Sequence, residues 1–318
     1  MKRLLTGLQP SGTLHIGNYF GALKPFADAC GEYESFLMLA DYHALTTGHL
    51  QRNPDKVRQS ILDVVRAYLA VGIDPVKTVI FQQSQVQEHT ELAWILECLV
   101  SVSFLELAHA YKDKVAKGLE ANAGLFNYPM LMAADILLYD TDIVPVGPDQ
   151  RQHVEYAREA AMKFNSAYGA TFKEPKELIQ NAATIPGTDG KKMSKSYGNT
   201  IPLFGTKDEI AKAVMSIITD SSGERPENVY AIHKHFRPEP ALGIIYDTNK
   251  GNYKALKEVL IEDIEALVAP MRERNAAISD DEVKRVLKEG SGKAREVASA
   301  KMTAVRNALG VSLGTVTK

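Results

Sequence analysis

The sequence predicts an α/β fold, in which a doubly wound parallel sheet with a helical insertion is followed by an all-α C-terminal domain. Two observations predict this fold. Short apolar strand patterns alternate with amphipathic helical patterns as far as Pro202, as in successive βαβ units. Beyond Pro202 only helical patterns follow. We therefore divide the chain into a sheet domain, residues 1–202, and an all-helical domain, residues 203–318.

Four short apolar strands are predicted for the sheet, and helical patterns separate them. The helix after the second strand has the clearest beginning, because Asn53 is a suitable cap and Pro54 suits the first turn. The strands are expected at Leu4–Thr6, Phe36–Ala40, Thr78–Phe81 and Ile143–Val146, and the buried stripe of that helix at Val57, Ile61, Val64, Val65, Tyr68 and Leu69.

Residues 88–138 form the predicted insertion of consecutive helices. Near its end Pro129 suits the first turn of a helix, and Tyr128, Met132 and Asp135 then share one helix face. The apolar side chains of the insertion either pack within the chain or form a surface for a partner. They are Leu92, Trp94, Ile95, Leu96, Leu99, Val100, Phe104 and Leu105.

The C-terminal domain is predicted to contain helices only. Its basic side chains recur at helical spacing, which is usually the mark of a solvated helix face. The helices are expected at Lys207–Ile217, Tyr253–Val268, Asp280–Leu287 and Ser291–Leu309, and the basic side chains are Lys284, Arg285, Lys288, Lys293, Arg295, Lys301 and Arg306.

Composition limits the class of protein. The two cysteines, Cys30 and Cys98, fit no metal spacing, so a disulfide framework, a zinc site and a Cys-ligated iron–sulfur cluster are not expected. We find no targeting segment and no run of about eighteen apolar residues, and we therefore expect a soluble, cytoplasmic protein without membrane association. A net charge of −2 argues against indiscriminate nucleic-acid binding, although local basic patches can still hold a folded RNA.

A polar loop carries two lysines three residues apart, Lys192 and Lys195, between Gly187 and Gly190 on one side and Gly198 on the other. Lysines bind phosphate as mobile point charges, and the glycines allow the loop to move toward a ligand. The loop is therefore a candidate polyphosphate site. From charge alone, a solvated basic loop is the commoner explanation.

A glycine-rich turn follows the first strand and precedes a helix near Gly17. The free N–H groups at a helix start attract phosphate, and an open parallel sheet binds nucleotides at such a turn. His15 and Asn18 add neutral polar groups beside it. His15 by itself is better explained as a turn or capping residue than as a ligand.

Taken together, the turn and the loop resemble the HIGH and KMSKS signatures of class I aminoacyl-tRNA synthetases. The matching segments are His15-Ile16-Gly17-Asn18 and Lys192-Met193-Ser194-Lys195-Ser196. Between them the chain resembles the bacterial type of the tryptophanyl branch, chiefly in Tyr128–Tyr139 and Val144–Glu155 and also in Asp41–Thr46 and Gly72–Pro75. The resemblance is close over the sheet domain, which it implies is Rossmann-like, and loose beyond it.

The resemblance implies ATP-dependent activation of L-tryptophan to tryptophanyl-adenylate and transfer of the acyl group to the 3′ end of tRNA(Trp). It further implies Mg²⁺ with the ATP, a homodimer formed through residues 88–138, and contact of the helical domain with the tRNA anticodon. No editing domain is expected, since the stretch between the signatures has no room for one.

The resemblance also assigns residues to roles. Catalysis falls to Lys192, Lys195 and Lys114; ATP binding to Gln9, Pro10, Ser11, Gly17, Asn18, Gly147, Pro148, Asp149, Ile185, Lys192, Met193, Ser194, Lys195 and Ser196; and tryptophan binding to Asp135, Tyr128, Met132, Gln150 and His43.

Elementary chemistry agrees with the assignment of Asp135. A carboxylate among Ala133, Ala134 and Ile136 is costly to bury without a donor, and an indole N–H is a donor only. Without the resemblance, pairing with an arginine or a helix cap is the commoner explanation for such an aspartate. His43, a lone histidine after a strand, is equally well explained as structural.

Leu5, Tyr42 and Pro148 depart from the pattern, since many bacterial relatives have Phe, Gln and Glu there. Three other functions stay open: a tyrosyl enzyme of the same subclass, a nucleotidylyltransferase that makes an acyl-adenylate without tRNA, and a catalytically silent paralogue. Tests of tRNA binding and of amino-acid-dependent exchange separate them.

Overall fold

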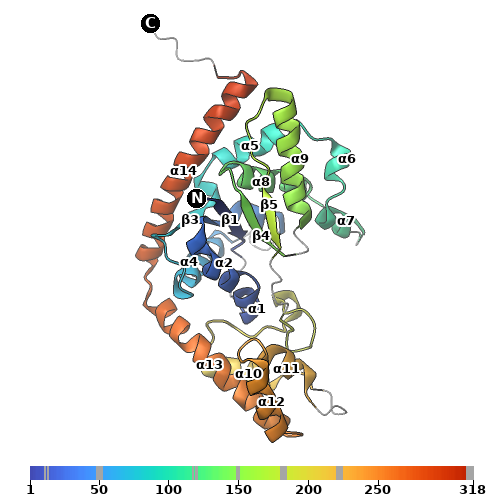
Figure 1. The fold of residues 1–318 in the computed structure, drawn as a ribbon, viewed down its shortest axis with the longest axis vertical. Helices are drawn as coiled ribbons and strands as arrows, with labels where there is room; N and C mark the ends of the chain where they lie inside the picture. The colour runs from blue at the N-terminus through green and yellow to red at the C-terminus, as the bar shows by residue number, and fades with distance from the viewer. Residues whose placement is uncertain are drawn as a thin grey trace.

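The computed structural model describes residues 1–10, 12, 14–47, 53–116, 118, 121–147, 151–179, 185–219 and 225–312. Figure 1 shows a sheet with its surrounding helices, a smaller group of helices at the other end, and one long helix that returns from the second group along the first. Among the described residues, no helix is long and apolar enough to cross a membrane.

The sheet has five parallel strands in the order β3-β2-β1-β4-β5. They are β1 (Arg3–Leu8), β2 (Glu34–Leu39), β3 (Thr78–Gln82), β4 (Ile143–Val146) and β5 (Lys176–Ile179). The doubly wound parallel sheet and the four predicted strands are confirmed. Strand β5 was not predicted, because it begins with the charged residues Lys176 and Glu177 and no apolar run marks it.

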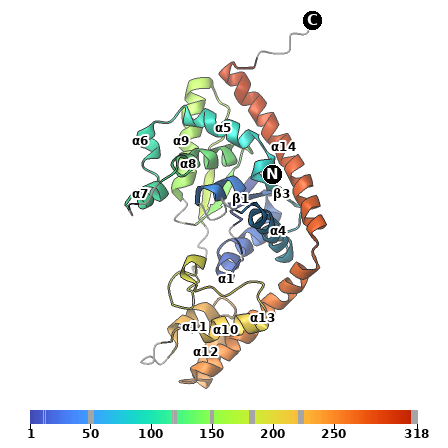
Figure 2. The same cartoon turned by 180° about the vertical axis from the view of Figure 1, so that it is seen from behind.

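Helices cover both faces of this sheet and form the second part of the molecule (Figures 1 and 2). The first part contains α1 (Ile16–Asn18), the π-helical η1 (Tyr19–Leu23), α2 (Lys24–Ala29), η2 (Cys30–Glu32), α3 (Asp41–Ala44), η3 (Leu45–Thr47), α4 (Pro54–Ala70), η4 (Gln83–Gln85), α5 (Glu88–Glu97), α6 (Val102–Leu105), α7 (His109–Ala116), α8 (Ala123–Leu137) and α9 (Arg151–Tyr168). Then follow η6 (Lys195–Tyr197), α10 (Lys207–Met215), α11 (Glu227–His233), α12 (Glu239–Thr248), α13 (Tyr253–Ala277) and α14 (Asp280–Leu309).

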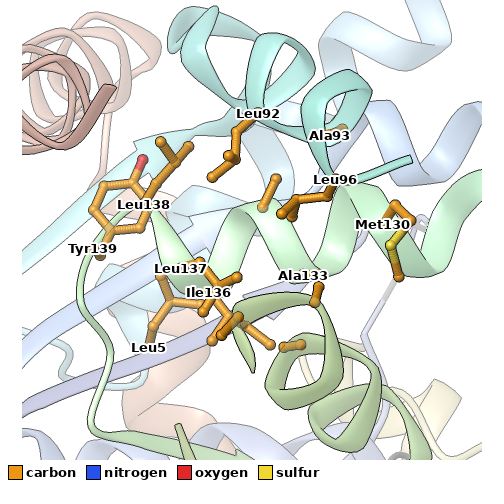
Figure 3. Packing of buried hydrophobic residues seen from close by; sticks show 14 of the residues in the cluster. Leu5, Leu92, Ala93, Leu96, Met130, Ala133, Ile136, Leu137, Leu138 and Tyr139 are labelled. Carbon is orange, nitrogen blue, oxygen red and sulfur yellow. The ribbon is translucent and has the colours of Figure 1, made fainter. Parts of the chain in front are cut away.

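The core lies on both sides of the sheet, because successive strand residues point to opposite faces. Leu5 of β1 packs with α5, α8 and α9, in the cluster of which Figure 3 shows a part. Leu4 packs on the other face with α2 and α4, in a cluster that continues through Ile201 and Leu203 to α10 and α13. A continuous core therefore joins the two parts of the chain, and a domain boundary at residue 202 stays a prediction.

Helix α14 packs along the edge strand β3. It is continuous through its own glycine-rich stretch at Gly290, where the sequence predicted a break between two helices. That prediction was wrong. A Cβ built on Gly290 would meet the carbonyl oxygen of Ile80, and the Ser291 hydroxyl accepts the N–H of Gln82 at 3.3 Å. Gly290 allows a close approach of helix to strand, and tertiary packing outweighs its low helix propensity.

Two other helix predictions need correction. Helix α8 begins at Ala123, where the side chain of Asn122 accepts the N–H of Leu125, so Pro129 lies inside the helix and not in its first turn. Helix α13 continues to Ala277, past Pro270. Helices α11 and α12 were not predicted. The Asn53 cap of α4 is confirmed, since its side chain accepts the N–H of Lys56 at 3.1 Å.

Candidate active site

A cavity of about 300 Å³ opens at the carboxyl ends of β1 and β4. Its walls include residues of β1 from Leu5 onward with the following Gln9, and residues of β4 from Val144 onward with the following Gly147. Side chains of α8 also line it. These two strands are neighbours in the sheet, but the next strand after β1 lies on one side of the pair and the next strand after β4 lies on the other. This is the switch point at which open parallel sheets bind ligands.

Asp135 lines this cavity and is almost completely buried. Three side chains of the described chain donate to its carboxylate: His43 Nε2 at 2.8 Å, Gln83 Nε2 at 2.8 and 3.0 Å, and His89 Nδ1 at 2.6 Å. Burial by itself raises the pKa of Asp135, but the neighbouring histidines outweigh burial and hold that pKa below its usual range. The carboxylate is therefore ionised at neutral pH.

The predicted companions of Asp135 surround the same cavity. Tyr128, Met132 and His43 all line it, as the shared helix face of α8 predicts for the first two. The Tyr128 hydroxyl bonds to His153 Nε2 at 2.9 Å, and burial raises the pKa of Tyr128 to about 12. Tyr128 therefore keeps its proton at neutral pH.

His15 caps the short helix α1 that follows the glycine-rich turn. Its Nδ1 accepts the N–H of Asn18 at 3.2 Å, and the Asn18 side chain accepts the N–H of His15 at 3.1 Å. Burial, and secondarily the charge of Lys195, lowers the pKa of His15 to about 4. His15 is thus a neutral capping residue, as the sequence suggested for His15 alone.

The lysine loop packs directly on this turn. Leu203 N–H donates to the Leu14 carbonyl, and Ile16 N–H to the Ile201 carbonyl. The buried Met193 faces Gly17, where an added Cβ would lie 3.4 Å from the Met193 Cβ, and the Lys195 ammonium lies 3.9 Å from the corresponding point on Gly12. The two signature segments therefore form one site.

Asn199, which is buried, organises the lysine loop. Its amide donates to Asp189 at 2.6 Å and to the Lys192 carbonyl at 3.2 Å, and its oxygen accepts the N–H of Ser194 at 2.8 Å. Lys192 and Lys195 both have exposed side chains, and desolvation lowers the pKa of Lys195. The loop thus presents two cations beside the turn.

The remaining predicted residues are placed as follows. Gln9 and Gly147 line the cavity, and Pro10 and Ile185 are buried. Lys114 lies in α7 and Ser196 in η6, but their side chains are outside what the structure describes. Ser11, Pro148, Asp149 and Gln150 lie outside the described residues altogether.

Sequence reasoning missed Gln83, His89 and Asn199. Gln83 had a usable signal, since it directly follows β3 at the edge of the sheet where ligands bind. His89 lies in a helix and Asn199 follows a loop, and no spacing in the sequence brings either to its partner. Only the folded structure brings His89 to Asp135 and Asn199 to Asp189.

A cavity at the switch point of a parallel sheet, beside a glycine-rich turn and a lysine loop, defines a nucleotide-binding α/β enzyme. A family model described as tRNA synthetases class I (W and Y) matches residues 1–291. The chain belongs to this family.

Individual relatives are similar along nearly the whole chain. The tryptophan–tRNA ligase of Fusobacterium nucleatum is 46% identical, over 98% of this chain and 98% of its own length. The tryptophanyl-tRNA synthetase of Campylobacter jejuni, solved in complex with ADP and tryptophan, is 43% identical with a TM-score of 0.89 and covers 97% of this chain and 99% of that one. That of Mycoplasma pneumoniae is 30% identical with a TM-score of 0.84, covering 98% of each chain.

Proposed function

We propose that this chain activates L-tryptophan with ATP and transfers the tryptophanyl group to the 3′ end of tRNA(Trp). One observation carries the proposal: an ionised carboxylate, Asp135, lines an otherwise largely apolar cavity at the switch point of the sheet. The similarity to tryptophan–tRNA ligases supports it.

The pocket selects tryptophan because an indole N–H is a donor and Asp135 is an acceptor. Phenylalanine would leave the buried carboxylate without that donor, and a missing hydrogen bond to a buried charge costs far more than a missing methylene. Met132 supports the ring with its polarizable thioether. Tyr128 and Gln150 are proposed to hold the α-amino group.

Activation requires alignment of two anions and neutralisation of charge on the leaving pyrophosphate. The tryptophan carboxylate attacks the α-phosphorus of ATP, the bond to the pyrophosphate oxygen breaks, and tryptophanyl-adenylate forms. Lys192 and Lys195 neutralise the leaving group, with Lys114 assigned to the same role. The remaining predicted ATP-binding residues line the nucleotide.

Mg²⁺ is proposed to accompany the ATP phosphates. The described residues contain no group of three His, Cys, Asp or Glu side chains that could hold a metal ion. Mg²⁺ usually keeps several waters and binds substrate phosphates with few protein ligands, so it does not need such a group and is expected to arrive with its nucleotide.

The proposal extends to partners. The helices after residue 202 are assigned to the tRNA anticodon. The surface of α5 to α7 is assigned to a homodimer, since Trp94, Val102, Leu107 and Val115 are exposed there. A soluble enzyme of the cytoplasm fits these partners.

Amino-acid-dependent ATP–pyrophosphate exchange tests the reaction, with tryptophan, tyrosine and phenylalanine supplied separately. We expect exchange with tryptophan only. Exchange with tyrosine would assign Asp135 to a phenol, and no exchange with any of the three would refute the activity. A tRNA(Trp) charging assay then tests the second step.

Replacement of the carboxylate tests the pocket. Asp135→Asn keeps the size of the side chain but presents an amide donor to the indole N–H, so we expect tryptophan affinity to fall by about two orders of magnitude while ATP affinity is retained. Equilibrium dialysis with each ligand measures both. Unchanged tryptophan affinity would exclude Asp135 as the indole acceptor.

A further inference from the structure

The carboxylate of Asp135 is almost saturated by its own chain. An ionised carboxylate offers about four accepting positions. His43, Gln83 and His89 donate to it among the described residues, the Gln83 amide nitrogen reaches both of its oxygens, and the carboxylate also lines the cavity. These three donors therefore fix the orientation in which the carboxylate meets a ligand in the cavity.

Gln83 is held in a single orientation. Its side chain is completely buried, and its amide oxygen accepts the backbone N–H of Tyr42 at 3.1 Å. The amide nitrogen must therefore face Asp135, where it donates to Oδ1 at 2.8 Å and to Oδ2 at 3.0 Å. A flipped amide would lose both interactions.

His89 is held in a single orientation. Its Nδ1 lies 2.6 Å from Asp135 Oδ1, and its Nε2 lies 2.8 Å from the Tyr139 hydroxyl. Because the carboxylate only accepts, Nδ1 carries a proton, and Nε2 on the other side of the ring pairs with the Tyr139 hydroxyl. The completely buried ring stacks on Phe81, with centroids 6.1 Å apart and planes at 21°.

None of Gln83, His89 and Tyr139 is among the described residues that line the cavity, whereas Asp135 and His43 are. These three residues therefore act on a ligand only through Asp135. Their arrangement is a chain of hydrogen bonds that begins at Tyr139 and Tyr42 and ends at the carboxylate.

We infer that His89, held by Tyr139, and Gln83 are positioning residues that determine tryptophan specificity by aiming Asp135 at the indole N–H. This inference rests on the proposed function. It predicts that discrimination against a ligand without the ring N–H depends on residues that never touch the ligand. Donors that hold the carboxylate in one orientation toward the cavity favour a ligand that places its own donor at the matching point.

The test compares two substitutions of His89 in the full-length enzyme. His89→Asn places an amide nitrogen close to the former Nδ1 and keeps a donor for Asp135, whereas His89→Leu removes the donor. The readout is the ratio of kcat/KM in pyrophosphate exchange for tryptophan and for β-(3-benzothienyl)alanine, in which sulfur replaces the ring N–H.

We expect His89→Leu to reduce this ratio roughly tenfold or more, the value of one hydrogen bond to a charged group, and His89→Asn to leave it within about threefold of the wild-type ratio. The acid limb of tryptophan KM should also move to higher pH in His89→Leu, because a carboxylate with fewer donors is protonated more easily. If kcat/KM falls by the same factor for both substrates and the pH profile is unchanged, His89 has a purely structural role.

Tyr139→Phe provides a second variant if His89→Leu does not fold. It removes only the hydroxyl that pairs with Nε2 of His89, and we expect a roughly threefold or greater drop in the same ratio; an unchanged ratio would overturn the inference. Failure of the proposed function is distinguishable, since the wild-type protein would then show no tryptophan-dependent exchange at all.

Discussion

At the residue scale, the two signature segments contribute a neutral histidine and two lysines. His15 is fixed as a cap by Asn18 and lies close enough to Lys195 for that charge to help lower its pKa. Lys192 and Lys195 are exposed residues of the loop that packs on this turn. The proposed site thus combines a capped helix start with two charged side chains.

Lys195→Ala should reduce the exchange rate at saturating substrates by about 10²–10³-fold, because a charge aimed at the leaving pyrophosphate acts mainly in the transition state. Tryptophan affinity, measured by equilibrium dialysis, should change little. The exposed Lys212 of α10 provides a matched control, and Lys212→Ala should leave exchange unchanged. Equal losses of rate and of tryptophan affinity in Lys195→Ala would contradict the role in pyrophosphate departure.

His15 should make the protein less stable in mild acid. Its pKa is about 4 in the folded chain and about 6.5 when unfolded, so the unfolded chain binds more protons between these values. The free energy of unfolding therefore falls as pH decreases from about 6.5 to 4. His15→Asn retains a capping oxygen and does not titrate, so it should lose about 1–2 kcal/mol less between pH 7 and pH 5. Urea unfolding at both pH values measures the difference, and identical losses in both proteins would refute the assignment.

One part of the candidate site could be predicted from spacing alone, and most of the other residues were assigned by the family resemblance. Tyr128, Met132 and Asp135 share a face of α8 because helical periodicity is local, and that periodicity is readable in one chain. The contacts of Gln83 and His89 with Asp135 were not predictable. Gln83 and His89 reach it from segments 52 and 46 residues away, and only the folded sheet brings them together.

At the element scale, strands and caps were predicted best where a local signal is strong. The strand patterns of β1 to β4 and the Asn53 cap of α4 have such signals. Helix α14 was predicted as two helices, because Gly290 and Gly292 weaken the local helical signal, whereas contact with β3 holds it as one. Tertiary packing thus decided the element that propensity alone predicts poorly.

The two glycines of α14 provide a matched pair of substitutions. Gly290→Ala places a methyl group against the Ile80 carbonyl and should destabilise the protein by about 2–3 kcal/mol, since neither backbone is free to yield. Gly292 has open space around it, and Gly292→Ala should stabilise the helix by about 0.5–1 kcal/mol. Chemical denaturation measures both. Similar effects of the two substitutions would show that α14 does not depend on close contact with β3.

At the scale of the whole molecule, the exposed apolar side chains are unevenly distributed. Trp94 on α5 is 67% exposed, and Val102, Leu107 and Val115 follow on the next two helices and their connection. A single chain gains nothing from leaving so large an aromatic ring in water, and aromatic side chains are typical of interface centres. This surface is where a second copy is expected.

Trp94→Glu should convert a dimer to monomers, because it places a charge at the centre of the expected interface. Sedimentation velocity over a range of concentrations measures the change. Ile244 on α12 is similarly exposed, at 70%, and Ile244→Glu should leave the dimer intact. A dimer that persists in Trp94→Glu would place the interface elsewhere.

The position of α14 on β3 has a consequence for the order in which the chain folds. Ser291 follows Gln82 by 209 residues, yet it caps a backbone N–H of the edge strand. A growing chain on the ribosome therefore exposes the open edge of β3 throughout the synthesis of the second group of helices. Unpaired strand edges promote association between chains. The edge of the sheet is therefore covered only when α14 has been synthesised, and we expect a chain terminated before α14 to aggregate.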